Sequence, residues 1–354
     1  MSSKTPLSSI IHSRQADPHK LYRPHRLLRN GDLQTVLGRH IPQDARLVNE
    51  DEQMILFDAG PDRSGLQPGQ TVRLLGFYTP GRNAAVSRPG PKGLVMLLHG
   101  WEGDSHSAYN LILGSALVRE GFDVVRMNMR DHGPTHHLNK GLFFATLIEE
   151  VHAATQQAGL LAAGRPFSMV GASLGGSFVV RMALRHAQIP IPNLHRAIAV
   201  NPVLNPRRTC LLLDNHLFLR RYFRSRWFES LSKKQQLFPE LYDFTSLSSV
   251  STIWEMSDWV TKSMSRFNGV EEYLDAYSVH PSEFHSLASP LTILTAANDP
   301  LIPSDDIAAL PSHPHLQVHI LPHGGHVGYN DLFPLRNCLP DLIRVLLVQE
   351  SGSG

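Results

Sequence analysis

The chain has 354 residues, of which 42% are hydrophobic and 18% are charged, so its length suits one large domain that carries an inserted segment. A formal net charge of +2, with most basic residues scattered, argues against a nucleic-acid partner. Two cysteines, Cys210 and Cys338, cannot build a disulfide framework and form no metal-binding pair, so reduced thiols are expected. Residues 1–25 form a polar N-terminal extension, and no apolar run has the length of a membrane span. These features predict a cytoplasmic protein without an integral membrane segment.

From about residue 93, short apolar runs alternate with longer helical patterns, which is typical of a doubly wound, mostly parallel sheet with helices on both faces. Runs at 54–57 and 72–78 are expected to precede it as an antiparallel edge. Parallel strands are expected at 94–98, 124–127, 167–170, 197–200, 291–295 and 318–321. Helices are expected at 108–120, 142–158, 176–186 and 335–348, where apolar residues recur with a period near 3.6.

The interval 203–288 separates two consecutive strands by far more than the roughly 2 to 6 residues of an ordinary connection. It predicts a helical cap inserted into a core formed by residues 26–202 and 289–348. Helical patterns within it cover 211–223, 227–238 and 270–277. Its arginines between positions 220 and 226 are interpreted as a solvated helix face. The expected roof of a substrate pocket consists of Leu211, Leu217, Phe218, Trp254 and similar residues.

The strongest chemical signal is the segment Gly171-Ala172-Ser173-Leu174-Gly175, a G-x-S-x-G motif between an apolar strand and a helical pattern. A tight turn from strand to helix requires very small residues two positions before and two after the serine, and both are glycine. The motif therefore predicts Ser173 as an exposed nucleophile, whereas a plain glycine turn is the alternative.

A serine hydroxyl is a weak nucleophile, so it requires a base within hydrogen-bond reach and a third group that orients the base. In doubly wound sheet enzymes that carry the G-x-S-x-G motif, the three residues follow one another along the chain in the order serine, acid, histidine. Asp299 follows one expected strand and His326 follows the next, so both should lie at the same sheet edge as Ser173. Asp305 or Asp306 is the alternative acid, and His323 is the alternative base.

Backbone N–H groups that stabilise a developing oxyanion are also predicted from position in the chain. The N–H of Leu174 begins the helix after Ser173, where backbone donors lack intrahelical partners. The N–H of Trp101 lies in a glycine-containing loop directly after the strand at 94–98. We expect these two donors to form the oxyanion hole, with no cofactor and no metal.

A second group of polar residues, Asp131-His132-Gly133-Pro134-Thr135-His136-His137, also follows an expected strand. Three histidines and one acid could bind a metal ion. Because the adjacent His136 and His137 point in different directions, a solvated loop is the preferred interpretation.

With these residues placed, the chain resembles the YheT-like branch of the α/β-hydrolases from about residue 22 to the C-terminal helix. The resemblance rests on Asn30-Gly31-Asp32-Leu33-Gln34-Thr35, His99-Gly100-Trp101-Glu102-Gly103 and Gly324-Gly325-His326-Val327-Gly328-Tyr329. It implies the α/β-hydrolase fold, with Ser173 as nucleophile, Asp299 as acid and His326 as base. It also implies esterase or lipase-like activity on short to medium acyl esters and acylglycerols, and so a role in lipid metabolism. Ala172 departs from the aromatic residue that the family often has there.

The sequence thus predicts a serine-dependent carboxylic ester hydrolase that acts on a small-molecule ester through an acyl-enzyme. Acyl transfer to an alcohol is the alternative within enzymes, because the acyl-enzyme accepts any nucleophile that the cap admits. A non-catalytic binding protein of the same fold is the alternative outside enzymes. It predicts a broken triad position, and none is broken.

Overall fold

A computed structural model describes residues 17–38, 40, 46–65, 69–82 and 92–348. Within these residues an eight-stranded sheet has the order β1-β2-β4-β3-β5-β6-β7-β8. Its strands are β1 (Gln53–Pro61), β2 (Thr71–Thr79), β3 (Leu94–Leu98), β4 (Asp123–Met127), β5 (Phe167–Ala172), β6 (Leu194–Val200), β7 (Leu291–Ala296) and β8 (Leu316–Leu321). Strands β3 to β8 run parallel to one another, while β1 pairs antiparallel with β2 and β2 pairs antiparallel with β4. The predicted α/β fold with its antiparallel edge is confirmed.

The two faces of the sheet bury different residues of the same strands, because side chains along a strand point to opposite sides in turn. In β3, Leu94, Met96 and Leu98 belong to the core packed against α6 (Ile148–Leu161) and α7 (Leu174–Arg185). Val95 and Leu97 belong to the core packed against α5 (Ala108–Arg119) and α13 (Leu339–Val348). Burial on both faces explains why these strands are continuously apolar in sequence.

The helix expected at 142–158 begins six residues later than predicted, at Ile148. Residues 142–147 form an irregular segment instead, in which the Phe143 N–H donates to Asp131 Oδ2 at 2.9 Å and the Ala145 N–H donates to Tyr273 Oη at 3.0 Å. These partners replace intrahelical hydrogen bonds. The apolar residues there face a cavity and not a helix interface, so their spacing was misleading.

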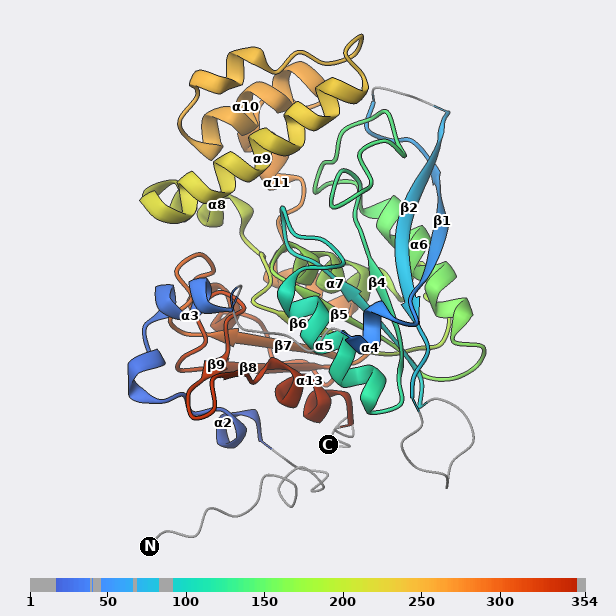
Figure 1. Cartoon of the computed structure of the whole chain (residues 1–354), viewed down its shortest axis with the longest axis vertical. Helices are drawn as coiled ribbons and strands as arrows, with labels where there is room; N and C mark the ends of the chain where they lie inside the picture. Colours follow the sequence, from blue (N-terminus) through green and yellow to red (C-terminus); the bar gives the residue numbers. More distant parts are fainter. Residues whose placement is uncertain (1–16, 39, 41–45, 66–68, 83–91, 349–354) are drawn as a thin grey trace, which may run out of the picture.

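Between β6 and β7 the chain forms a layer of helices beyond one end of the sheet (Figure 1). This layer contains α8 (Pro206–Asn215), α9 (Leu217–Leu237), η2 (Thr245–Ser249), α10 (Ile253–Met264) and α11 (Val270–Asp275), after which the chain returns through η3 (Pro281–Ser286), which lies against α7. Helix α9 is continuous, whereas two separate helical patterns were expected. Helix α10 was not predicted, although Thr252 caps it by accepting the Glu255 N–H at 3.1 Å, a signal that the sequence contains.

The prediction of which residues roof the pocket is wrong. Leu211, Leu217 and Phe218 are 47%, 71% and 59% exposed, so they face solvent. Trp254 is partly buried but does not line the cavity described below. The helical pattern was therefore assigned to the wrong face, because α8 and α9 carry apolar residues on more than one side.

Four short α-helices, one 3₁₀ turn and two short strands complete the described chain: α2 (Pro18–Leu21), the 3₁₀ turn η1 (Arg26–Leu28), α3 (Gly31–Leu37), α4 (Arg46–Asn49), α12 (Ser304–Ala308), β9 (Asn330–Asp331) and β10 (Arg336–Asn337). Among the described residues, no helix combines the length and apolarity needed to cross a membrane.

Candidate active site

Ser173 lies in the turn between β5 and α7 with φ 55° and ψ −117°, a conformation that is rare for a residue with a side chain. The neighbouring glycines make this turn possible. A Cβ added to Gly171 would lie 2.2 Å from the Gly175 carbonyl oxygen, and one added to Gly175 would lie 2.4 Å from that of Leu98. Close backbone packing on both sides therefore holds the serine at the carboxyl end of the strand.

The structure brings Ser173, His326 and Asp299 together from three different loops. His326 Nε2 lies 2.9 Å from Ser173 Oγ, and His326 Nδ1 lies 2.9 Å from Asp299 Oδ2. The side chains of His326 and Asp299 are 7% and 0% exposed. This hydrogen-bonded chain can transfer the hydroxyl proton to the imidazole and stabilise the resulting imidazolium.

The alternative acids lie elsewhere. Asp305 and Asp306 both pair with Arg208, at 2.9 and 2.8 Å, and neither contacts His326. His323, the alternative base, makes no hydrogen bond with Ser173 within the described chain.

Asp299 is fixed by donors on both of its oxygens. Its Oδ1 accepts the N–H groups of Leu301 at 2.8 Å and Ile302 at 3.0 Å. Its Oδ2 accepts Asn201 Nδ2 at 2.6 Å in addition to His326. Asn201 was missed by sequence reasoning, although it directly follows β6 and so lies at the same sheet edge.

Asn201 is in turn held by Tyr329, whose hydroxyl donates to Asn201 Oδ1 at 2.8 Å. Because this bond fixes the orientation of the amide, the NH₂ group must face Asp299. Burial raises the pKa of Tyr329 well above its usual value, so the phenol remains a donor.

We predict that Asn201→Leu lowers kcat for ester hydrolysis about tenfold, since it removes one hydrogen bond to the charged acid but leaves His326 bonded to it. The change in KM should be small, because Asn201 does not line the cavity. Steady-state kinetics measure both quantities. Tyr329→Phe, which frees the amide without deleting it, should lower kcat less. An unchanged kcat in Asn201→Leu would remove Asn201 from the positioning of Asp299.

The loop that carries His326 is held by the N-terminal segment around α3. The His326 N–H donates to Thr35 Oγ1 at 2.9 Å, and the Asn330 N–H donates to Gln34 Oε1 at 2.7 Å. A Cβ on Gly325 would lie 2.3 Å from the Gly31 carbonyl oxygen. The motif Asn30 to Thr35 was recognised in sequence without a role, and its role here is to position the histidine loop.

The predicted oxyanion donors lie beside the serine. A Cβ built on Gly100, the residue before Trp101, would be 3.7 Å from Ser173 Oγ. Leu174 is the first residue of α7, where the backbone N–H has no intrahelical acceptor. Within the described chain, neither the Trp101 nor the Leu174 N–H has a hydrogen-bond partner. Both donors are therefore free to bind a substrate oxygen.

His99 holds the Trp101 loop against the loop after β4. The Met129 N–H donates to His99 Nε2 at 3.0 Å, which leaves Nδ1 to donate to the Gly100 carbonyl oxygen at 2.8 Å. Burial lowers the pKa of His99 to about 4, so the imidazole is neutral and keeps this pattern at ordinary pH.

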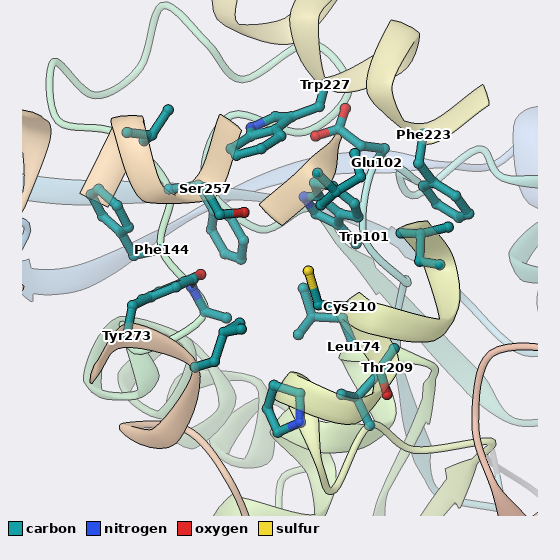
Figure 2. Close-up of a pocket in the computed structure, with 18 of the residues that line it drawn as sticks. Trp101, Glu102, Phe144, Leu174, Thr209, Cys210, Phe223, Trp227, Ser257 and Tyr273 are labelled. Atoms are coloured by element: carbon teal, nitrogen blue, oxygen red, sulfur yellow. Dashed lines mark hydrogen bonds between the residues drawn. The ribbon is translucent and has the colours of Figure 1, made fainter. Parts of the chain in front are cut away.

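A cavity of about 140 Å³ extends from Ser173 and His326 into the helical layer. Figure 2 shows Trp101, Glu102, Phe223 and Trp227 gathered on one side of it. The Trp101 indole stacks on Phe223 with a centroid distance of 5.6 Å and meets Trp227 edge to face at 5.3 Å. The remaining apolar lining of the cavity includes Leu142, Phe144, Val203, Leu213, Ile253 and Val260. This lining suits an apolar group.

The loop at 131–137, interpreted from sequence as solvated, is largely buried. Asp131, His132 and His136 are at most 7% exposed. Lys234 of α9 reaches Asp131 Oδ1 at 2.7 Å, and His136 Nε2 lies 2.8 Å from Ser230 Oγ of the same helix. The loop thus anchors α9 to the sheet domain, which the sequence could not reveal because the partners are about 100 residues away. No cluster of potential metal ligands occurs among the described residues.

Comparisons with known proteins agree with the α/β fold of this chain. The family model described as "Serine aminopeptidase, S33" matches residues 89–332. The fold is similar to that of the Pyrococcus furiosus esterase Pf2001 (12% identity, TM-score 0.52, covering 87% of this chain and 94% of that one). It is also similar to Est1E from Butyrivibrio proteoclasticus with bound ferulic acid (15% identity, TM-score 0.50, covering 78% and 93%). A third similar structure is 2,6-dihydroxy-pseudo-oxynicotine hydrolase (13% identity, TM-score 0.51, covering 90% and 71%). At these identities the structures share the fold alone.

Among curated proteins, 104 residues are 34% identical to potassium channel subfamily K member 7 from Homo sapiens. The match covers 28% of this chain and 34% of that protein, so the chain spans about a third of that relative's length.

Proposed function

Because this chain belongs to the serine aminopeptidase S33 family of α/β-hydrolases, we propose that it is a serine-dependent carboxylic ester hydrolase that acts on short to medium acyl esters or acylglycerols. The observation that carries the proposal is the chain Ser173–His326–Asp299, with both hydrogen bonds at 2.9 Å, at the end of an apolar cavity. Residues 203–288 act as a cap over that cavity.

In the proposed mechanism His326 Nε2 takes the proton from Ser173 as Oγ attacks the ester carbonyl carbon. The carbonyl oxygen becomes an oxyanion that accepts the N–H groups of Trp101 and Leu174, each worth about 3 to 4 kcal/mol in comparable enzymes. The bond to the alcohol oxygen breaks, and His326 returns the proton to that oxygen. Water then attacks the acyl-enzyme with His326 as base and releases the acid.

A fluorophosphonate probe tests the activated serine, and it requires no knowledge of the substrate. The folded protein should be labelled at Ser173, and nitrophenyl butyrate should be hydrolysed. Absence of both reactions would favour a binding protein, and faster cleavage of alanyl nitroanilide than of the ester would favour aminopeptidase activity. Ester exchange with added ethanol that exceeds hydrolysis would favour acyl transfer.

We predict that kcat/KM rises with acyl length from acetate upward and falls once the cavity is full, because each buried methylene contributes about 0.8 kcal/mol. A nitrophenyl ester series below micelle thresholds measures the profile. Ser257→Leu on α10 would fill part of the cavity, so it should move the optimum to a shorter chain.

The matched control is Ser249→Leu, since Ser249 is exposed on η2 and outside the cavity. This control should retain the optimum of the unaltered protein. If Ser257→Leu leaves the profile unchanged, the acyl chain does not occupy this cavity.

A further inference from the structure

A second cavity, of about 310 Å³, also reaches Ser173 and His326. The two cavities share Trp101, Glu102 and Phe223 as well, so these side chains line the boundary between them. Beyond the shared residues the second cavity is much more polar than the first, with Asp104, His106, Tyr109, Tyr222 and Arg226 in its lining. An ester has two halves, and the serine is open to two cavities of different character.

The position of His326 indicates which half of the ester each cavity binds. His326 must return its proton to the alcohol oxygen, so the alcohol has to lie on the side of the imidazole. The second cavity continues past His326 along Val327 and Thr35, which do not line the first cavity. The first, apolar cavity instead includes Leu174, a proposed oxyanion donor, and runs into the cap. The alcohol therefore fits the second cavity and the acyl chain fits the first.

Most polar groups of the second cavity already have partners. Asp104 Oδ1 accepts the His106 N–H at 2.8 Å, and the Tyr109 hydroxyl accepts the Gly100 N–H at 2.6 Å. Arg226 lies 3.5 Å from Glu229. Among the charged side chains of this lining the exception is Glu102, whose carboxyl group has no hydrogen-bond partner within the described chain.

The surroundings of Glu102 indicate the kind of group it can bind. Burial raises the pKa of Glu102 to about 8; Asp131 and Glu229 act in the same direction, while Arg226 opposes them. At pH 7 the carboxyl group is therefore mostly protonated, and it can both donate and accept a hydrogen bond. A hydroxyl group matches this pattern, whereas an ammonium group would require the ionised form and would face Arg226.

We propose that Glu102 is a specificity-determining residue that hydrogen-bonds a free hydroxyl on the alcohol half of the substrate, so that the preferred esters are monoesters of a polyol. This inference rests on the proposed ester hydrolase function. It assigns a binding group that the Ser173–His326–Asp299 chemistry does not use.

The test compares two esters of nearly equal size, 2-hydroxyethyl butyrate and propyl butyrate, which differ by a hydroxyl in place of a methyl group. The unaltered protein should prefer the hydroxyethyl ester at least about tenfold in kcat/KM. Glu102→Met should reduce that ratio to about twofold or less, while Glu102→Gln, which still hydrogen-bonds, should keep most of it. Glu240→Met is the matched control, because Glu240 is exposed and lines neither cavity, and it should keep the full ratio.

The outcomes separate this inference from the function on which it rests. If the unaltered protein hydrolyses both esters at equal rates, the hydroxyl site is wrong and the ester hydrolase stands. If 2-aminoethyl butyrate is preferred over both, the site recognises a cation and the hydroxyl assignment is overturned. If no ester reacts and the fluorophosphonate probe does not label Ser173, the proposed function itself fails.

Discussion

Ser173→Ala should lower kcat for ester hydrolysis about 10⁵- to 10⁶-fold, since no other group can form the acyl-enzyme. The fold should persist, because the Ser173 side chain makes one hydrogen bond, to His326. Alanine at this position has the same backbone strain at φ 55° as serine, so the substitution adds no strain. Nitrophenyl butyrate hydrolysis and fluorophosphonate labelling measure the loss, and a thermal melt checks the fold.

Ser177→Ala is the matched control, because Ser177 lies one turn further along α7 and is buried in the same helix. Its hydroxyl has no hydrogen-bond partner within the described chain, so its removal should leave activity and labelling intact. Turnover that persists in Ser173→Ala, or labelling that disappears in Ser177→Ala, would contradict the assignment of the nucleophile.

The sheet could be predicted from sequence because its strands are short, buried on both faces and separated by regular helices. The residues that form the Ser173–His326–Asp299 chain could be predicted for a related reason. Each follows a recognisable strand, and the carboxyl ends of parallel strands lie along one edge of the sheet. Asn201 satisfies the same positional rule, but an asparagine followed by proline carries no motif that distinguishes it from a turn.

The helical layer was harder to predict because its residues are buried by contacts between segments distant in sequence. Lys234 reads as a solvated residue of α9, yet it is buried against Asp131, 103 positions earlier. Residues 142–147 have helix-like apolar spacing, but the side chains of residues 142–145 line the cavity between the sheet domain and the helical layer. The spacing of apolar residues identifies the buried side of a helix only when a single surface covers that helix. These segments are covered by both the sheet domain and the helical layer, so the spacing does not identify one buried side.

The placement of the chain in the YheT-like branch stays a prediction, since the family model that matches the chain is that of the serine aminopeptidase S33 family. The segments on which that resemblance rests have physical roles in the structure. Thr35 holds the backbone of His326, and Gly100 approaches Ser173 closely. The same residues that suggested a relationship therefore shape the proposed active site.

Asp299→Asn should lower kcat about 10⁴-fold by changing the tautomer of His326. The N–H groups of Leu301 and Ile302 both donate to Oδ1, so the new amide must keep its oxygen there and present its NH₂ group where Oδ2 now lies. That NH₂ group would face His326 Nδ1, which could then only accept a hydrogen bond. The proton would move to Nε2, and the imidazole could no longer take the proton from Ser173.

The controls for this prediction are Asp305→Asn and Asp306→Asn, which remove the same charge from a neighbouring position on α12. Both carboxylates pair with Arg208 and lie outside the hydrogen-bond network of His326, so each change should cost less than about twofold. Steady-state kinetics at pH 8 with nitrophenyl butyrate compare the three variants, and circular dichroism confirms that each is folded. A near-normal rate in Asp299→Asn together with a large loss in Asp306→Asn would show that the structure's His326–Asp299 hydrogen bond is not the one that orients the base.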